Sequence, residues 1–242
     1  MKKGHSLASR LSQYGACFLL VQLMLGCSPE PAAQNQATQA LDLSNASTDA
    51  RTPQADSKLV VAFGDSLYAG YNLGASEGFP SALERALATR GLKAQVVNAG
   101  VSGDTSAAGL ARLAFTLDGQ PRKPDLVIVG LGGNDMLRGL APEETRANLD
   151  KILAELKARG IPAMLTGMVA APNMGRDYAD AFNPIYPDLA RKYDVPLYAF
   201  FLDGVIGQRQ LMLADGIHPN AQGVAKVAGS VAPLVAEALK GG

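Results

Sequence analysis

The chain has 242 residues, a length that fits one domain with accessory segments. Hydrophobic residues make up 48% of it, enough for a sizeable core. Basic and acidic residues balance at 22 each, whereas a nucleic-acid-binding protein would carry a basic patch or a high pI. We therefore expect no nucleic-acid partner.

The first 26 residues predict a secretory signal peptide. Basic residues come first (Lys2, Lys3 and Arg10), and an apolar run over residues 15–26 follows them. The run is about a dozen residues long, whereas a helix that spans a bilayer needs about 20. A short apolar run behind a basic start is typical of a signal peptide. A transmembrane anchor is an alternative that this length disfavours.

The apolar run ends at Leu-Gly-Cys, which resembles the lipobox of bacterial lipoproteins. We expect cleavage before Cys27 and lipidation of Cys27; a plain secretory signal that is cut nearby is the alternative. Either interpretation places the protein in the bacterial cell envelope, lipid-anchored at the outer membrane or periplasmic. Residues 27–57 are rich in Ala, Gln, Ser, Thr and Asn and predict a disordered tether. The domain expected over residues 58–242 has no cysteine, which excludes a disulfide, a thiol nucleophile and a Cys-ligated zinc.

From residue 58 onward, short apolar runs alternate with longer amphipathic stretches. In chain order they predict a strand over residues 59–63, a helix over 79–90, a strand over 94–98, a helix over 106–116, a strand over 126–131, a helix over 142–159, a strand over 163–168, a helix over 177–193, a strand over 196–200 and a helix over 221–239. Continuous apolar runs are typical of strands buried on both faces. The alternation therefore predicts a three-layer α/β/α fold, with a doubly wound, five-stranded parallel sheet in the middle.

Polar, glycine-rich segments lie where such a sheet places its functional site, beyond the carboxyl ends of the strands. They are residues 64–67 (GDSL), 98–104 (NAGVSGD) and 132–135 (GGND) after the first three strands, and residues 215–220 (DGIHPN) before the last helix. Each segment alone is also typical of a helix cap or a turn. Together they supply the parts of an acyl-transfer apparatus.

Ser66 is the candidate nucleophile in that apparatus. A hydroxyl needs a base to take its proton, and a histidine is the commonest choice. His5 lies in the predicted signal peptide, so His218 is the domain's only imidazole, which also excludes a multi-His metal site. Asp215 lies three residues before His218, within reach of its ring through a short turn. We therefore expect a triad of Ser66, His218 and Asp215.

The attacked carbonyl becomes an oxyanion, which needs preorganised hydrogen-bond donors. The backbone N–H groups of Ser66 and Gly103 and the side-chain amide of Asn134 are the candidates. Glycine at position 103 allows its backbone to approach a substrate closely. Asp65, Asp104 and Asp135 flank these segments, and we interpret them as structural carboxylates that cap loops or helices.

These four segments, in this order, resemble the four motif blocks of the SGNH (GDSL) hydrolases, and the resemblance extends over nearly all of residues 58–239. It is strongest for the bacterial branch of lysophospholipase L1, thioesterase I and arylesterase. The resemblance implies a flavodoxin-like fold, no metal, no cofactor, and an oxyanion hole made by Ser66, Gly103 and Asn134. It also implies small acyl ester, thioester or lysophospholipid substrates, and an acyl pocket shaped by residues 168–176.

Two alternatives stay open from the sequence. One is an O-acetyl esterase that acts on envelope polysaccharide, since the same family constellation also removes acetyl groups from sugars. The other is a non-catalytic envelope protein that binds an acyl or sugar ligand in the same crevice.

Overall fold

Five parallel strands form one sheet in the computed structural model, which describes residues 57–241. The strands are β1 (Lys58–Gly64), β2 (Ala94–Gly100), β3 (Leu126–Gly130), β4 (Ala163–Thr166) and β5 (Leu197–Tyr198). Their order across the sheet is β2-β1-β3-β4-β5, with every pairing parallel. The predicted doubly wound sheet is confirmed. The signal peptide, Cys27 and almost all of the tether lie outside the described residues.

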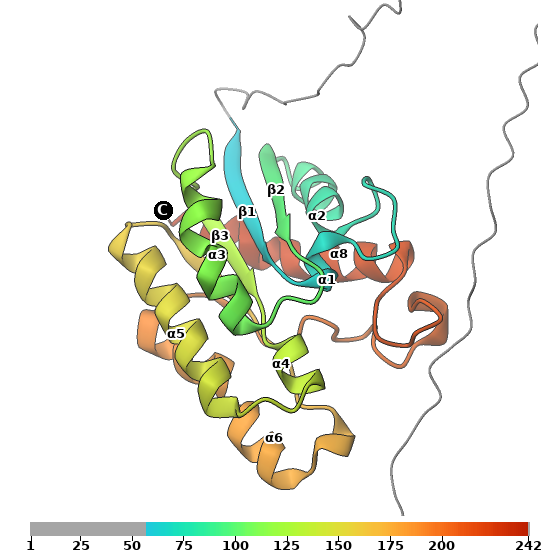
Figure 1. Cartoon of the computed structure of the whole chain (residues 1–242). Helices are drawn as coiled ribbons and strands as arrows, with labels where there is room; N and C mark the ends of the chain where they lie inside the picture. Colours follow the sequence, from blue (N-terminus) through green and yellow to red (C-terminus); the bar gives the residue numbers. More distant parts are fainter. Residues whose placement is uncertain (1–56, 242) are drawn as a thin grey trace, which may run out of the picture. The chain divides into compact units, whose positions relative to one another are not determined.

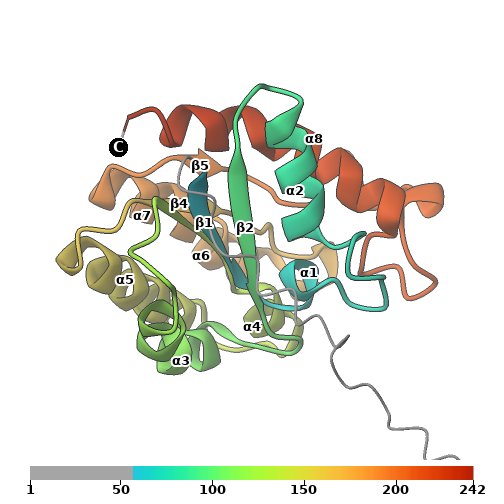
Figure 2. The ribbon, with the colours of Figure 1, turned by 90° about the horizontal axis from the view of Figure 1, so that it is seen from above.

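Helices cover both faces of the sheet and make the outer two layers (Figure 2). One layer contains α2 (Phe79–Ala88) and α8 (Ala221–Ala238), and the other contains α3 (Ser106–Asp118), α5 (Pro142–Ala158), α6 (Arg176–Phe182) and α7 (Ile185–Tyr193). Two short helices, α1 (Ser66–Ala69) and α4 (Gly133–Leu137), lie at the carboxyl ends of the strands that precede them. Single 3-10 turns occur at Pro172–Met174 and Arg209–Leu211. No helix among residues 57–241 is both long and apolar enough to cross a membrane.

Successive side chains of each central strand point to opposite faces of the sheet and pack into two separate hydrophobic cores. Val60 and Ala62 of β1 pack with α2 and α8, while Val61 and Phe63 pack with the helices of the opposite layer. Such alternation follows from the two-residue period of a strand. Strands β1, β3 and β4 are buried almost throughout, but the edge strands β2 and β5 are largely half-exposed. Burial on both faces therefore holds for the central strands only, because an edge strand has a neighbour on one side alone.

The single helix predicted over residues 177–193 is wrong, since two helices, α6 and α7, occupy this range. The break falls at Asn183 and Pro184. Proline has no N–H to donate to the carbonyl four residues earlier, and its ring clashes there. Asn183 gains a tertiary contact at the break, because its side-chain oxygen accepts a hydrogen bond from the N–H of Ala170, 2.8 Å away.

All five strands run in the same direction, so their carboxyl ends gather at one edge of the sheet. In Figure 1 this is the edge beside α1 and α4, and the described chain enters at the opposite edge. The motif segments that follow β1, β2 and β3 therefore lie together, as expected for a doubly wound sheet.

Candidate active site

Ser66 is the first residue of α1, directly after β1. Asp65 caps this short helix, since its Oδ1 accepts a hydrogen bond from the N–H of Leu67 at 3.0 Å. Behind Ser66, the buried Tyr68 ring lies against the strand ends, and a Cβ at Gly64 would lie only 2.5 Å from it. The Tyr68 hydroxyl reaches across the sheet to Thr166 Oγ1 at 2.7 Å. Glycine at the end of β1 thus lets α1 pack tightly and holds Ser66 at the edge of the sheet.

Ser66, His218 and Asp215 form a continuous hydrogen-bonded chain. Ser66 Oγ lies 2.8 Å from His218 Nε2, although 152 residues separate the two in sequence. His218 Nδ1 lies 2.7 Å from Asp215 Oδ2. With the ring proton on Nδ1, His218 donates to the carboxylate and its Nε2 is ready to accept the proton of Ser66. The structure therefore brings together the three residues predicted as a triad.

Asp215 is fixed by its own loop. Its second oxygen, Oδ1, accepts hydrogen bonds from the N–H groups of Ile217 (2.9 Å) and His218 (3.0 Å). Gly216, with φ +69°, makes the turn that permits this arrangement. Burial opposes ionisation of Asp215, but the hydrogen bonds from His218 and Ile217 outweigh it and lower the pKa of Asp215 to about 2. The carboxylate is therefore charged at neutral pH and holds the His218 ring in one orientation.

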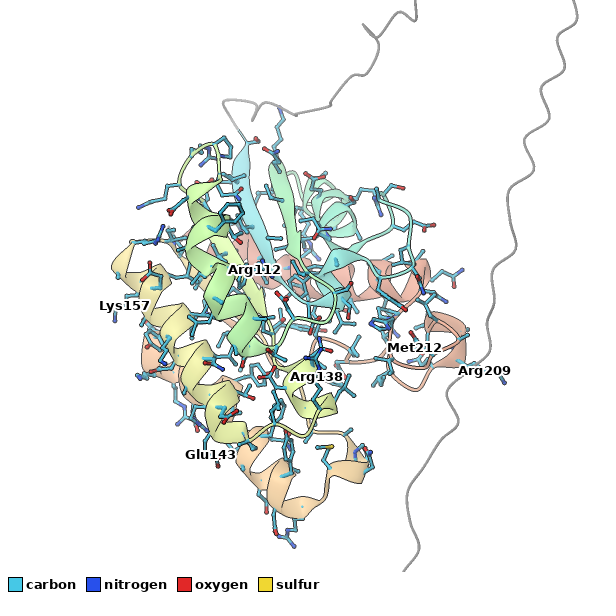
Figure 3. All side chains as sticks on the ribbon, viewed as in Figure 1. Arg112, Arg138, Glu143, Lys157, Arg209 and Met212 are labelled. Atoms are coloured by element: carbon cyan, nitrogen blue, oxygen red, sulfur yellow. The ribbon has the colours of Figure 1, made fainter. Side chains whose placement is uncertain are left out.

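The three predicted oxyanion donors face the same space. Among the described residues, the backbone N–H groups of Ser66 and Gly103 have no hydrogen-bond acceptor. The Asn134 side-chain nitrogen donates to the carbonyl of Asp104 at 2.9 Å, which leaves its second N–H available. Gly103 adopts φ +88°, a conformation that favours glycine. Arg138 lies at the end of α4 (Figure 3). Its Nη2 donates to the Gly103 carbonyl at 2.8 Å.

Arg112 of α3 links the two segments that carry the backbone donors, a role that the sequence alone did not reveal. Its Nη2 donates to the Gly64 carbonyl at 3.0 Å, and its Nε lies 2.6 Å from Asp104 Oδ2. The guanidinium also stacks over the Phe63 ring, 4.2 Å from the ring centroid. Gly64 and Asp104 lie close in sequence to Ser66 and Gly103. Arg112 therefore fixes the position of one segment relative to the other. No local pattern marks an arginine in mid-helix for such a role.

Two of the three flanking carboxylates, Asp65 and Asp135, cap helices as expected, whereas Asp104 forms an ion pair. Asp65 caps α1 and Asp104 pairs with Arg112. Asp135 Oδ2 accepts from the N–H of Ser106 at 2.8 Å, and its Oδ1 accepts from the hydroxyls of Ser106 and Thr145. Asp135 thereby fixes the start of α3 against α4 and α5. Burial raises the pKa of Asp65 to about 6, against the opposing effects of the Leu67 N–H and His218.

Tyr71 is a second residue whose role the sequence alone did not reveal. Its ring stacks on His218 with 4.4 Å between the centroids and 30° between the planes. Its N–H donates to the Ser66 carbonyl at 3.2 Å, which ties the chain after α1 back to the nucleophile. The stacking covers one face of the His218 ring and so limits its motion.

A cavity of about 780 Å³ opens in front of the triad. Ser66, Gly103, Asn134 and His218 line its polar side. Its apolar walls come from the segment expected to shape an acyl pocket and from three further segments: Met168, Val169, Ala170, Ala171 and Pro172, with Leu137, Phe200, Leu202, Ile206 and Ile217. Apolar walls with a few convergent polar groups are typical of a small-molecule site. In the described part of the chain, no three His, Cys, Asp or Glu side chains cluster as metal ligands do.

The family model of GDSL-like lipases and acylhydrolases matches residues 62–226. The chain belongs to this family. It is 43% identical to the esterase TesA of Pseudomonas aeruginosa, over 69% of this chain and 83% of the relative. It is 45% identical to the thioesterase 1/protease 1/lysophospholipase L1 of Escherichia coli, over 70% of this chain and 78% of the relative.

Solved structures agree with this assignment of the family and the fold. The crystal structure of AlinE4, an esterase of the SGNH-hydrolase family, is 52% identical and superposes with a TM-score of 0.66, covering 77% of this chain and 98% of its own. A crystal structure of TesA superposes with a TM-score of 0.70 at 39% identity, covering 75% of this chain and 99% of its own. The resemblance inferred from the motifs is therefore confirmed, and the protein is an ester hydrolase of the SGNH type.

Proposed function

We propose that Ser66, His218 and Asp215 hydrolyse a carboxylic ester or thioester through an acyl-enzyme. The hydrogen-bonded chain from Ser66 Oγ to Asp215 Oδ2, with its 2.8 Å and 2.7 Å links, is the observation that carries the proposal. A serine, a base in contact with it and a third group that orients the base are the signature of nucleophilic catalysis.

The reaction has two halves. In the first, His218 Nε2 takes the proton of Ser66 while Oγ attacks the carbonyl carbon. The oxyanion accepts hydrogen bonds from the N–H groups of Ser66 and Gly103 and from the Asn134 amide, and His218 then protonates the leaving alcohol or thiol. In the second, His218 takes a proton from water, whose oxygen attacks the acyl carbon. The bond between that carbon and Ser66 Oγ then breaks, the acid leaves, and His218 returns the proton to Ser66 Oγ. The charged Asp215 stabilises the protonated ring in both halves.

The cavity favours an acyl group longer than acetyl. Its volume of about 780 Å³ and its apolar walls suit a medium or long chain, whereas an acetyl group would leave most of the walls exposed to water. We therefore favour aryl esters, lysophospholipids or acyl thioesters, the substrate classes that the names of the relatives indicate, among them an arylesterase of Vibrio mimicus that is 42% identical. The alternative is an O-acetyl esterase, and a series of esters with acyl chains of different length distinguishes the two.

The proposal extends to the location of the enzyme. The basic start, the apolar run and the Leu-Gly-Cys sequence before Ser28 support cleavage at Cys27 and a lipid anchor in the bacterial envelope. Mass spectrometry of the mature protein from a bacterial host tests this directly. A diacylglyceryl adduct on an N-terminal Cys27 is the expected result, and an unmodified N-terminus elsewhere would contradict it.

Hydrolysis of p-nitrophenyl esters from acetyl to palmitoyl tests the chemistry. The parent protein should turn over the butyryl to decanoyl esters fastest, and Ser66→Ala should abolish turnover while leaving the thermal unfolding unchanged. Ser102→Ala is the matched control, since Ser102 lines the same cavity, whereas the His218 ring is hydrogen-bonded to Ser66 and Asp215. Strong preference for the acetyl ester would favour the sugar esterase. A folded parent that neither hydrolyses any ester nor reacts with a fluorophosphonate would favour a non-catalytic binding protein.

A further inference from the structure

Exposed apolar side chains concentrate around the mouth of the active-site cavity. Seven large hydrophobic residues among residues 57–241 are strongly exposed, and one of them, Phe115 on α3, lies away from the cavity. The other six, each between 41% and 53% exposed, form what we call the apolar collar: Tyr71, Val101, Leu137, Val169, Ile206 and Ile217. Five of these six line the cavity, and Val101 precedes Ser102, which also lines it.

The collar is built from six different segments at the carboxyl edge of the sheet. Its residues follow α1, β2, β4 and β5, end α4, and precede α8. Side chains that only enclosed a substrate would turn their apolar surface inward. These residues instead leave about half of their surface exposed to water. Exposed apolar side chains that gather in one patch are typical of a surface that contacts another molecule or a membrane.

We propose that the apolar collar docks on a lipid bilayer and that the cavity receives its substrate from that bilayer. A protein partner seated on a collar that surrounds an opening would close the cavity to substrate, and a second copy of the chain would do the same. A lipid surface instead presents acyl chains to the opening. Arg138 adds a cationic group at this mouth, since it is exposed and donates from one nitrogen only to the protein. Its free N–H groups suit a lipid phosphate.

The length of chain ahead of the domain is compatible with this orientation. The described chain enters at the edge of the sheet opposite to the collar (Figure 1). Strand β1, with 7 residues, spans roughly 23 Å between the two edges. Between the predicted lipidated Cys27 and Lys58 lie 30 residues, which reach at most about 100 Å when extended. An anchor at Cys27 therefore allows the domain to turn its collar toward the membrane that holds it.

Vesicle flotation of residues 57–242 tests the proposal. This part folds without the preceding segment, because the matched AlinE4 structure consists almost wholly of the equivalent part, 98% of its own chain. Ser66→Ala is used as the parent so that the lipid is not consumed. It should float with vesicles of equal parts phosphatidylcholine and phosphatidylglycerol, and adding Leu137→Ser and Ile206→Ser should lower the partition coefficient about tenfold, as expected from the apolar surface lost. Phe115→Ser is the matched control and should float like the parent.

A fluorescence measurement tests the same proposal without the double substitution, in case that variant does not fold. The chain contains no tryptophan, so a single Val101→Trp keeps the collar apolar and provides a probe. Its emission should shift to the blue when vesicles are added, and that of Phe115→Trp should not. Failure of the parent to float, or an equal loss from Phe115→Ser, would overturn the proposal. A dimer in sedimentation velocity that dissociates on the two collar substitutions would also overturn it, since the collar would then bind a second copy.

The inference rests on the proposed hydrolase function only for the cleavage of substrate after docking. Flotation needs no turnover, and hydrolysis of a soluble p-nitrophenyl ester needs no membrane. A protein that hydrolyses the soluble ester but does not float retains its proposed function and lacks this docking surface.

Discussion

Replacing Asp65 by asparagine should make the protein more stable at neutral pH. The Asp65 carboxyl is only 3% exposed, and burial raises its pKa from 3.8 to about 6, against the Leu67 N–H and His218, with Asp104 and Asp135 adding to the rise. Asparagine keeps the oxygen that accepts from the N–H of Leu67 and removes the ionisation. The substitution therefore removes only the energetic cost of burying a charged carboxylate.

The magnitude follows from the shift in pKa. A group whose pKa is higher in the folded protein contributes stability below its unfolded value, and that contribution is lost as the pH rises through the folded value. A shift of about 2 units, at about 1.4 kcal/mol for each unit, corresponds to about 3 kcal/mol. The free energy of unfolding of Asp65→Asn relative to the parent should therefore rise by about 3 kcal/mol between about pH 3 and pH 7.5. For a domain of this size, that is a rise of roughly 6–12 °C in Tm.

Urea unfolding, followed by circular dichroism at several pH values, measures this difference. Asp125→Asn is a control of opposite sign: burial opposes ionisation of Asp125, but hydrogen bonds from the Leu59 N–H and Arg122 prevail and lower its pKa. Its replacement should destabilise the protein at neutral pH, and the deficit should shrink as the pH falls through the folded pKa. A difference between Asp65→Asn and the parent that stays constant from about pH 3 to 7.5, or that moves against Asp65→Asn, would refute the reasoning.

Three further predictions concern catalysis, each measured with p-nitrophenyl butyrate. Asn134→Ala should lower kcat about 10²–10³-fold with little change in KM, because it removes an oxyanion donor; an unchanged kcat would remove Asn134 from the oxyanion hole. Asp215→Asn should lower kcat about 10⁴-fold at neutral pH. A kcat of Asp215→Asn equal to that of the parent would remove Asp215 from the triad. Arg112→Met should lower kcat at least about tenfold and leave KM nearly unchanged, since Arg112 positions the segments of Ser66 and Gly103 and touches no substrate. The surface variant Arg159→Met, which loses ion pairs to Asp118 and Glu155, is its control and should retain kcat.

Much of the architecture and of the site follows from local sequence. Buried strands show as apolar runs, and helices begin and end at recognisable residues such as Pro142 at the start of α5. Because parallel strands gather their carboxyl ends at one edge, the residues that follow β1, β2 and β3 must lie close together there. His218 needed no geometry to be chosen as the base, since it is the domain's only histidine.

Other features depend on contacts between residues far apart in the chain, and only the tertiary structure decided them. The order of the strands, the stacking of Tyr71 on His218 and the link from Arg112 to Gly64 each join segments that no local pattern relates. The burial that raises the pKa of Asp65 comes from packing around the whole strand end, not from its sequence neighbours. Periodicity and capping act over a few residues, so the sequence reports them directly; packing and desolvation sum over the whole fold, so they appear only once the chain has folded.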